Sequence, residues 1–385
     1  MAERDMATLV SSFNSARINL KAITENYRAL RQSTSGQLMV VLKGDAYGHG
    51  LLECANALVL SGAAHLGVLD VHEAMALAGA KYKATIHILA GLEGPESMRL
   101  SVAHDFVVLV YSWEQLSALA QIAQSLNKTC QVRIKIDTGM GRLGFHWEQF
   151  GEIIGKVKTL KNIKVLGLAT HLPTCGDSEA TWQLKRFTDL KTQADRVIGL
   201  KLSHSALASG GLLAHPDYED DLTRVGLLLY GYSPLTVDSP CLFDLPRSRN
   251  LIKSLKPVMS VKSQVIQVRT FKAGETVGYD RTYRISKDIK VATAPIGYLH
   301  GISRHRSSRG FALIGGRQAP LLGRVSMNLS TYDVSQIAAM TGNEVVIFGE
   351  QGGEKLGADL VGSWQDTSPY EVLVTSGRLN NRVYD

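Results

Sequence analysis

Residues 40–50 read VVLKGDAYGHG, an apolar run that ends at Lys43 and continues as a loop rich in glycine. Lys43 therefore stands where a buried strand gives way to a loop, and parallel α/β folds keep their functional residues at such strand ends. A lysine partly removed from water has a lowered pKa, so its neutral amine can attack carbonyl groups. Taken alone, Lys43 is more simply a strand-end lysine whose ammonium group reaches solvent.

The same alternation of short apolar runs and amphipathic segments continues to about residue 225. The expected strands are Leu38–Leu42, His65–Leu69, Thr85–Leu89, Phe106–Val110, Val132–Ile136, Val165–Thr170, Leu200–His204 and Leu222–Val225. The expected helices include Leu20–Leu30, Val71–Ala80, Trp113–Leu126, Trp147–Leu160 and Glu179–Ile198. Eight strands alternating with helices predict a (β/α)8 barrel. The alternation of strands and helices does not show whether the sheet closes on itself, so a doubly wound open sheet remains the alternative.

From Pro257 onward the pattern changes to short β-like runs separated by Gly, Pro and Asp turns. The expected strands are Val261–Arg269, Ile289–Ala294, Phe311–Ile314 and Glu344–Phe348, with one short helix at Val334–Met340. We therefore predict a barrel domain over residues 12–248 and a mainly β domain over residues 249–385, with a linker near Leu242–Leu255. The strand-like segment Ala16–Leu20 has no place in the barrel count, so we expect it to join the β-rich domain.

Composition excludes several classes of protein. The chain is 45% hydrophobic and 20% charged, and 42 Lys+Arg against 35 Asp+Glu give a net charge of +7 that is spread along the sequence. A nucleic-acid partner is not expected from so even a distribution. The four cysteines lie far apart and form no C-x-x-C pair, which fits a reducing cytoplasm. No segment is long and apolar enough to predict a membrane span.

Further polar residues follow the other expected strands. Residues 135–144 read KIDTGMGRLG, and Arg142 projects from this glycine-rich loop, where it could bind a carboxylate with two hydrogen bonds. His171 ends the sixth strand, and Ser209 follows the seventh. Taken alone, Arg142 is more simply a surface arginine in a turn, and His171 is more simply a packed histidine. Gly226 and Leu227 follow the eighth strand, in the region where barrels commonly bind phosphate.

These stretches together resemble the alanine racemase family of fold-type III enzymes, which use pyridoxal 5'-phosphate (PLP). The resemblance covers about residues 12–382 and rests on at least six separated segments in the same order. It implies that Lys43 carries the cofactor as an aldimine. It also implies that the residues holding the phosphate are Tyr47, Ser209, Gly226, Leu227 and Tyr370.

The resemblance also implies roles around the cofactor ring and the substrate. His171 would pack against the pyridine ring, and Arg224 would face the pyridine nitrogen. An arginine has a pKa above about 12 and does not readily give up a proton, so the nitrogen would stay unprotonated and the ring would be a weaker electron sink. Arg142 would lie near the substrate carboxylate, and Lys135, seven residues earlier, is often carbamylated in the family.

A second base is implied in the β-rich domain, where residues 276–283 read TVGYDRTY. Tyr279 matches the catalytic tyrosine of the family, in which the β-rich domain of one subunit covers the barrel mouth of the other. The implied protein is a homodimer that interconverts L- and D-alanine with Lys43 and Tyr279 as the two bases. It would supply D-alanine, as a cell-wall (peptidoglycan) precursor. Tyr298 and Met327 belong to segments that line the substrate entrance.

Three positions depart from the family pattern. Ala208 replaces an asparagine, His300 replaces an aspartate, and Asn328 stands where aspartate is common. These changes leave open a racemase with a wider or different substrate range, such as serine, lysine or arginine. Two further alternatives are a decarboxylase of the same fold type, against which Arg224 argues, and a non-catalytic PLP-binding carrier, in which Tyr279 would have no purpose.

Overall fold

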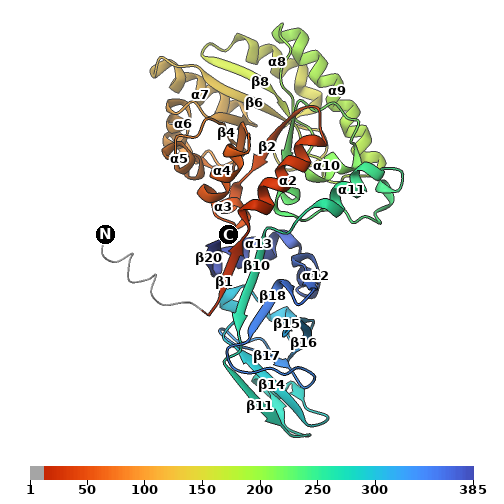
Figure 1. Cartoon of the computed structure of the whole chain (residues 1–385). Helices are drawn as coiled ribbons and strands as arrows, with labels where there is room; N and C mark the ends of the chain where they lie inside the picture. The colour runs from red at the N-terminus through yellow and green to blue at the C-terminus, as the bar shows by residue number, and fades with distance from the viewer. Residues whose placement is uncertain (1–12) are drawn as a thin grey trace. The chain divides into compact units, whose positions relative to one another are not determined.

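The computed structural model describes residues 13–385, which form two compact units (Figure 1). The barrel unit consists of Lys21–Ala46 and Leu51–Lys256. The β unit consists of Tyr47–Gly50, Pro257–Asp385 and the described residues up to Leu20. Lys43 therefore belongs to the barrel unit, whereas Tyr47, four residues later in the chain, belongs to the β unit.

The barrel unit is built on a parallel sheet of eight strands. They are β2 (Gln37–Val41), β3 (His65–Val68), β4 (Thr85–Ile88), β5 (Val107–Val110), β6 (Cys130–Asp137), β7 (Phe145–His146), β8 (Ile163–Ala169) and β9 (Leu222–Val225). The order is β7-β6-β5-β4-β3-β2-β9, and β8 pairs with β6. This parallel sheet with its helices is followed by a mainly β unit, as expected for a (β/α)8 barrel and a β-rich domain.

The prediction of a strand at Leu200–His204 is wrong, because the structure has no regular strand between α9, which ends at Ile198, and α10, which begins at Ser209. Residues 203–208 run between β8 and β9 as an irregular segment. They still connect β8 to β9: the N–H groups of Ser203 and Ser205 donate to β8, and the carbonyl groups of His204 and Leu207 accept from β9. The carboxylate of Asp220 accepts the N–H groups of Ala206 and Leu207, at 2.7 and 3.1 Å. Side-chain acceptors of this kind satisfy the backbone without a strand ladder.

Helices follow the strands of the barrel unit. They are α2 (Leu20–Gln32), α4 (Leu51–Leu60), α5 (Val71–Gly79), α6 (Gly94–Ala103), α7 (Trp113–Ser125), α8 (Phe150–Thr159), α9 (Ser178–Ile198), α10 (Ser209–Ala214) and α11 (Pro246–Ser254). Asp70, Ser112 and Asp177 cap α5, α7 and α9 by accepting a backbone N–H in the first turn. α11 forms within the segment that we expected to be a linker. None of the helices in residues 13–385 meets the length and hydropathy needed to cross a membrane.

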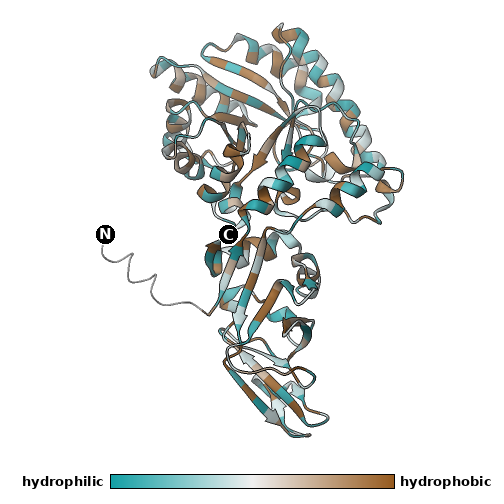
Figure 2. Cartoon of the chain, in the orientation of Figure 1, coloured by the Kyte–Doolittle hydropathy of each residue, from teal (hydrophilic) through white to brown (hydrophobic). Residues whose placement is uncertain are grey.

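Apolar side chains hold the helices of the barrel unit on the sheet. One cluster of buried residues joins Ile134 of β6 and Leu168 of β8 to Phe150 of α8 and Phe187 of α9. Burying a side chain of this size contributes about 1.5–3 kcal/mol. Figure 2 shows the strands mainly in the hydrophobic colour, while the helices alternate between hydrophobic and hydrophilic residues. This packing fixes the strand ends from which the candidate functional residues project.

The β unit contains a long sheet of ten strands, a small sheet formed by β12 and β13, and two α-helices. Its strands are β1 (Ser15–Ile18), β10 (Met259–Gln264), β11 (Gln267–Phe271), β12 (Thr276–Val277), β13 (Tyr283–Arg284), β14 (Ile289–Ala294), β15 (Phe311–Ile314), β16 (Arg317–Leu322), β17 (Ser330–Asp333), β18 (Glu344–Gln351), β19 (Glu354–Leu356) and β20 (Asn381–Tyr384). The sheet order is β11-β14-β17-β16-β15-β18-β10-β1-β20. β1 lies antiparallel to β10 and parallel to β20. The helices are α12 (Ala358–Trp364) and α13 (Pro369–Leu379).

Two details of the β unit differ from the sequence prediction. The expected strand Val261–Arg269 is divided into β10 and β11. The N–H of Val265 donates to the carbonyl of Asn343, just before β18, whereas the N–H of Ile266 donates to the carbonyl of Thr293 in β14. The expected helix Val334–Met340 is a series of turns, in which the N–H of Ile337 donates to Val334. The N–H of Met340 is taken by the side-chain oxygen of Asn343, at 2.9 Å, so it makes no helical bond.

Candidate functional site

Lys43 lies at the carboxyl end of β2, where the chain makes a left-handed turn. Gly44, Asp45 and Ala46 have φ angles of 67°, 59° and 53°. Left-handed conformations cost a residue other than glycine roughly 1–2 kcal/mol. Strain of this size persists where the surrounding structure holds it, which is common at functional sites. The lysine that the sequence singled out is therefore presented by a specialised turn at the mouth of the barrel.

Glu73 of α5 holds this turn and was missed by the sequence analysis. Its Oε1 accepts the N–H of Asp45 and its Oε2 accepts the N–H of Leu69, both at 2.9 Å. One carboxylate thus connects the loop after β2 with the loop after β3. The sequence offered one signal for Glu73, which is its position three residues after Asp70. Asp followed by Glu after three residues is typical of the start of a helix, and Asp70 caps α5.

We expect Glu73→Ala to lower the free energy of unfolding by about 1–3 kcal/mol, because the partly buried N–H of Asp45 and the exposed N–H of Leu69 both lose a charged acceptor. Glu73→Gln keeps one carbonyl oxygen and should lose less. Urea titration of the cofactor-free protein measures both changes. Equal stability of all three proteins would show that the carboxylate does not hold the two loops together.

Five basic side chains share one electrostatic environment at the barrel mouth: Lys43, Lys135, Arg142, His171 and Arg224. Burial, Arg142 and Arg224 lower the pKa of Lys43, while Glu73 opposes the shift. Burial holds the pKa of Lys135 well below its ordinary value, and Arg224 and Arg142 add to the effect. Burial lowers the pKa of His171 to about 3, with the four other groups acting in the same direction. The site therefore favours uncharged amines and an anionic ligand.

Arg224 on β9 is fixed by several acceptors. Its Nη1 donates to the Ser205 carbonyl at 3.0 Å and to the Ser205 hydroxyl. Its Nη2 donates to the Thr170 carbonyl at 2.7 Å and lies 3.4 Å from Nδ1 of His171. The guanidinium therefore ties the ends of β8 and β9 to the irregular segment between them, and it brings two of the predicted residues, Arg224 and His171, together.

Ser209 and Gly226 form a small polar turn beside Arg224. The Gly226 N–H donates to the Ser209 hydroxyl at 3.0 Å, and Ala208 makes an isolated bridge to Arg224. Ser209 and Leu227 are buried, with exposed fractions of 5% and 1%. A hydroxyl and backbone N–H groups arranged in this way suit the oxygen atoms of a phosphate group.

The loop that carries Arg142 is anchored by residues that sequence reasoning also missed. The carboxylate of Asp137 accepts the N–H groups of Gly139, Met140 and Gly141, at 2.8–2.9 Å. On the other side, Arg186 of α9 donates to the Thr138 carbonyl at 3.0 Å and lies between the rings of Trp147 and Trp182. A polar residue on a long amphipathic helix ordinarily faces solvent, so no local pattern identified Arg186.

His171 is expected to make stability depend on pH. Its pKa is about 3 in the folded chain and 6.5 in an unfolded one, so below pH 6.5 the unfolded chain binds a proton that the folded chain does not. Stability from this group is thus present above pH 6.5 and is lost as the pH falls towards 3. We expect His171→Gln to reduce the loss between pH 7 and 4 by on the order of 1–3 kcal/mol.

Urea titration of the cofactor-free protein across this pH range measures the effect of His171→Gln. His305→Gln, at an exposed position of the β unit, is the matched control. An identical pH dependence in His171→Gln and the unmodified chain would contradict the account of His171.

The remaining predicted residues lie in the β unit. The rings of Tyr47 and Tyr370 have centroids 5.9 Å apart, and burial raises the pKa of the Tyr47 hydroxyl, which therefore stays protonated. Tyr279, Tyr298 and Met327 are exposed, with exposed fractions of 65%, 40% and 51%. The Tyr298 and Leu299 N–H groups donate to the carbonyls of Ser326 and Met327, so Tyr298 and Met327 come from adjoining segments.

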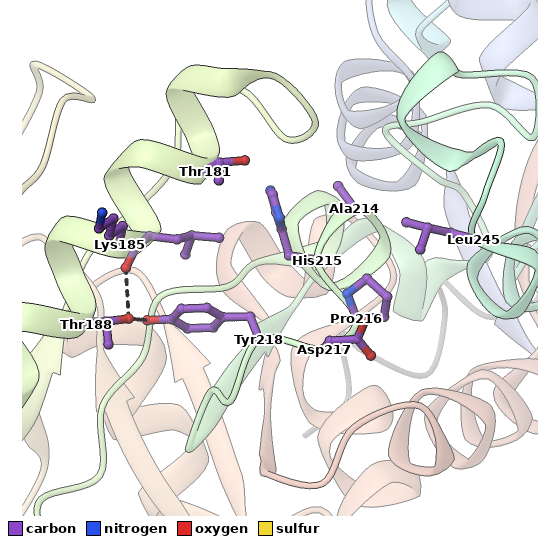
Figure 3. A pocket seen from close by; sticks show the side chains of 10 residues that line it. Thr181, Lys185, Thr188, Ala214, His215, Pro216, Asp217, Tyr218 and Leu245 are labelled. Atoms are coloured by element: carbon purple, nitrogen blue, oxygen red, sulfur yellow. Dashed lines mark hydrogen bonds between the residues drawn. The ribbon is translucent and has the colours of Figure 1, made fainter.

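A groove on the barrel unit lies between α9 and the segment that follows α10 (Figure 3). Its lining includes Lys185, His215, Asp217 and Tyr218, and the hydroxyl groups of Thr188 and Tyr218 lie 3.2 Å apart. None of the predicted site residues lines it. No group of three or more His, Cys, Asp and Glu within residues 13–385 is arranged to hold a metal ion.

Comparison with known proteins identifies the fold and the family. Residues 18–234 match the family described as "Alanine racemase, N-terminal domain", and residues 258–384 match "Alanine racemase, C-terminal domain". The chain is 34% identical to the alanine racemase of Syntrophobacter fumaroxidans, covering 94% of each chain, and 33% identical to that of Sorangium cellulosum, covering 96% of this chain and 98% of the other.

Solved structures agree. The alanine racemase of Streptomyces lavendulae superposes with a TM-score of 0.87 at 30% identity, covering 97% of each chain. That of Bartonella henselae, solved with covalently bound pyridoxal phosphate, has a TM-score of 0.84 at 26% identity, covering 97% of this chain and 99% of the other. Both halves of the chain and nearly all of its length are thus accounted for, and the chain belongs to the alanine racemase family.

Proposed function

We propose that this protein is a PLP-dependent isomerase that interconverts L- and D-alanine. The observation that carries the proposal is Lys43, a lysine at the end of a barrel strand whose pKa is lowered by burial and by two arginines. A lysine in that state supplies a neutral amine, both as a nucleophile towards an aldehyde and as a base. The alanine racemases to which this chain is 31–34% identical over nearly its whole length support the choice of alanine.

The residues at the barrel mouth fit PLP. The cofactor carries a phosphate and a ring oxygen, both anionic, and the five basic groups that share this mouth favour such a ligand. The Ser209 hydroxyl and the Gly226 N–H are suited to the phosphate, and Leu227 follows them with a buried backbone. We propose the hydroxyl groups of Tyr47 and Tyr370 as further phosphate ligands, supported by the mutual proximity of their rings.

We propose that Arg224 and His171 set the electronic properties of the cofactor. When bound, PLP supplies an electron-withdrawing ring that acidifies the Cα–H bond of an amino acid attached to it. Arg224 is held by backbone carbonyl groups and keeps its protons, so it would leave the pyridine nitrogen without one. His171 is neutral at pH 7 and would pack against the ring without adding charge. A weaker electron sink suits proton exchange better than transamination.

Two bases would act on opposite faces of the substrate. Lys43 would remove or return the Cα proton at its Nζ atom on one face, and Tyr279 would do so at its hydroxyl oxygen on the other. Arg142 would hold the substrate carboxylate, and Tyr298 and Met327 would line the entrance. Burial holds the pKa of Lys135 well below its ordinary value and so favours the uncharged amine, which can add CO2; we propose that it becomes a carbamate whose negative charge holds Arg142.

We propose a homodimer in which Tyr279 serves the Lys43 of the partner subunit. The support is the exposure of Tyr279, Tyr298 and Met327 in the β unit, because such apolar surface is often covered by a partner. The test is to mix two inactive proteins, Lys43→Ala and Tyr279→Phe, and let the subunits exchange. A mixed dimer holds one intact pair of Lys43 and Tyr279, so activity should return to about a quarter of the normal value.

That quarter follows because half of the randomly assorted dimers are mixed, and each has one working site of two. The control mixes each variant with itself. If both groups came from one subunit, the mixture would stay inactive, since no subunit carries both.

The substrate range is tested by chiral chromatography after incubating the PLP-loaded protein with single L-amino acids. We expect D-alanine to form fastest. Burial lowers the pKa of His300, so this histidine is neutral at pH 7 and the entrance carries less negative charge than an aspartate would give it. Faster conversion of serine, lysine or arginine would overturn alanine as the main substrate. No conversion of any amino acid would overturn the racemase.

We further propose that the product D-alanine serves peptidoglycan synthesis and that the protein works in the cytoplasm, where free cysteines persist. The domain boundary at residue 248 is also a proposal. Limited proteolysis that cuts near this position would support it, because domain boundaries lie in segments with few stabilising contacts.

A further inference from the structure

Cys175 and Cys241 come together beside the Ser209–Gly210 turn, although they lie far apart in the sequence. Cys175 belongs to the loop between β8 and α9, and Cys241 lies in the short helical turn Pro240–Leu242. A Cβ added to Gly176 would overlap the Cβ and Sγ atoms of Cys241. The next residue in the chain from Cys175 therefore lies directly against Cys241, and the two thiols are close enough for Cys241 to affect the pKa of Cys175.

The sulfur of Cys175 also packs on the candidate phosphate turn. A Cβ added to Gly210 would overlap the Cys175 Sγ atom, so only a glycine fits beside it. The backbone of Cys175 acts on the ring of His215, which is one of the residues that line the groove in Figure 3. Both cysteines are partly exposed, whereas Cys54 and Cys130 are buried.

Thiol chemistry is the property that this cluster offers. The structure within residues 13–385 contains no metal-binding group of three His, Cys, Asp or Glu residues, so Cys175, Cys241 and His215 do not form one. Burial, Cys241 and Asp177 raise the pKa of the Cys175 thiol, so Cys175 reacts only through the small fraction present as thiolate and its exchange should be slow at neutral pH. A partly exposed pair of neighbouring thiols is a typical substrate for thiol–disulfide exchange.

We propose that Cys175 and Cys241 form a modification site that reacts with a small disulfide such as oxidised glutathione and closes to an intramolecular disulfide. One thiolate attacks the small disulfide, forms a mixed disulfide and releases one glutathione thiolate. The second thiol loses its proton, attacks the protein-bound sulfur and releases the second glutathione. The two protein thiols lose two electrons and two protons in total, and the oxidant becomes two molecules of glutathione.

The disulfide should also weaken cofactor binding. To reach Cys241, the Cys175 Sγ must turn away from Gly210, and the turn that holds the Ser209 hydroxyl loses the atom packed against it. This second step rests on the proposed role of Ser209 as a phosphate ligand. We therefore expect the Kd for PLP to rise several-fold on oxidation and to recover with dithiothreitol.

The test begins with the full-length reduced protein, which is incubated with oxidised glutathione and then freed of it. We expect two of the four thiols to be lost, an intact mass lower by about 2 Da, and one peptide pair that joins Cys175 to Cys241. Cys175→Ser and Cys241→Ser should each give a single glutathione adduct and no cross-link. Cys54→Ala, which removes a buried thiol, should still form the cross-link.

Persistent glutathione adducts on the unmodified protein, or four free thiols after treatment, would overturn the site. The cofactor step is decided by titrating PLP by absorbance into oxidised and reduced protein. An unchanged Kd would overturn the link to the cofactor. If neither form binds PLP, the proposed function fails, while the peptide map still decides whether the disulfide forms.

Discussion

Lys43→Ala is expected to slow alanine racemisation by about 10³-fold or more, because the substitution removes both the covalent attachment point for PLP and one of the two bases. The structure argues that this lysine is special among the lysines at the barrel. It directly precedes a left-handed turn, and its pKa is lowered by burial and by Arg142 and Arg224. The measurement is the rate of D-alanine formation, together with borohydride reduction of the loaded protein.

Borohydride should fix PLP irreversibly on the unmodified chain, at Lys43, and should leave Lys43→Ala unlabelled. Lys164→Ala, which removes an exposed lysine of β8, is the matched control and should keep both activity and labelling. Stability separates this effect from misfolding. Burial and two arginines disfavour the charged form of Lys43, so removal of this side chain should not lower the unfolding midpoint of the cofactor-free protein. PLP fixed to another lysine would contradict the assignment.

Tyr279→Phe is expected to lower racemisation by about 10²–10⁴-fold while leaving the fold intact, because it deletes only the hydroxyl that we propose as the second base. The ring is 65% exposed and follows Gly278, whose φ is 81°. Asp280, the next residue, forms an ion pair with Arg324 at 2.8 Å. The turn is thus held by its neighbours, and the loss of one oxygen should not move it.

The decisive feature is the direction of the remaining exchange. If Lys43 is the base for D-alanine and Tyr279 the base for L-alanine, Tyr279→Phe in deuterated water should still exchange the Cα proton of D-alanine and should lose exchange with L-alanine. Lys43→Ala should lose both reactions, because the cofactor is no longer attached. Tyr283→Phe, at a half-buried tyrosine in the neighbouring strand β13, is the control and should stay active. Equal loss of exchange with both enantiomers in Tyr279→Phe would contradict a separate base for each face.

The sequence analysis worked best where function or burial leaves a local signal. Val40–Leu42 is apolar because β2 is buried, and the glycines after Lys43 accompany a turn with positive φ angles. The missed residues act across the fold. Glu73, Gln183 and Arg186 lie on helices, where a polar side chain most often faces water, and only the tertiary structure shows that they contact site loops.

The incorrect elements have a related cause. Leu200–His204 has β-like composition, but the carboxylates of Asp221 and Asp220 accept the N–H groups of His204 and Ala206. Apolar periodicity does not report which acceptor a backbone N–H will find. The same limit explains Val334–Met340, whose helix-like spacing is overridden by the side chain of Asn343.

The most direct test of two-base racemisation is to follow L-alanine in deuterated water with the PLP-loaded protein during the first few per cent of conversion. If Lys43 and Tyr279 act from opposite faces, the D-alanine formed should carry deuterium at Cα, because the proton returned by Lys43 comes from solvent. The unreacted L-alanine should keep its original proton at this stage. D-alanine that retains the original proton would indicate one base acting on both faces and would contradict the account.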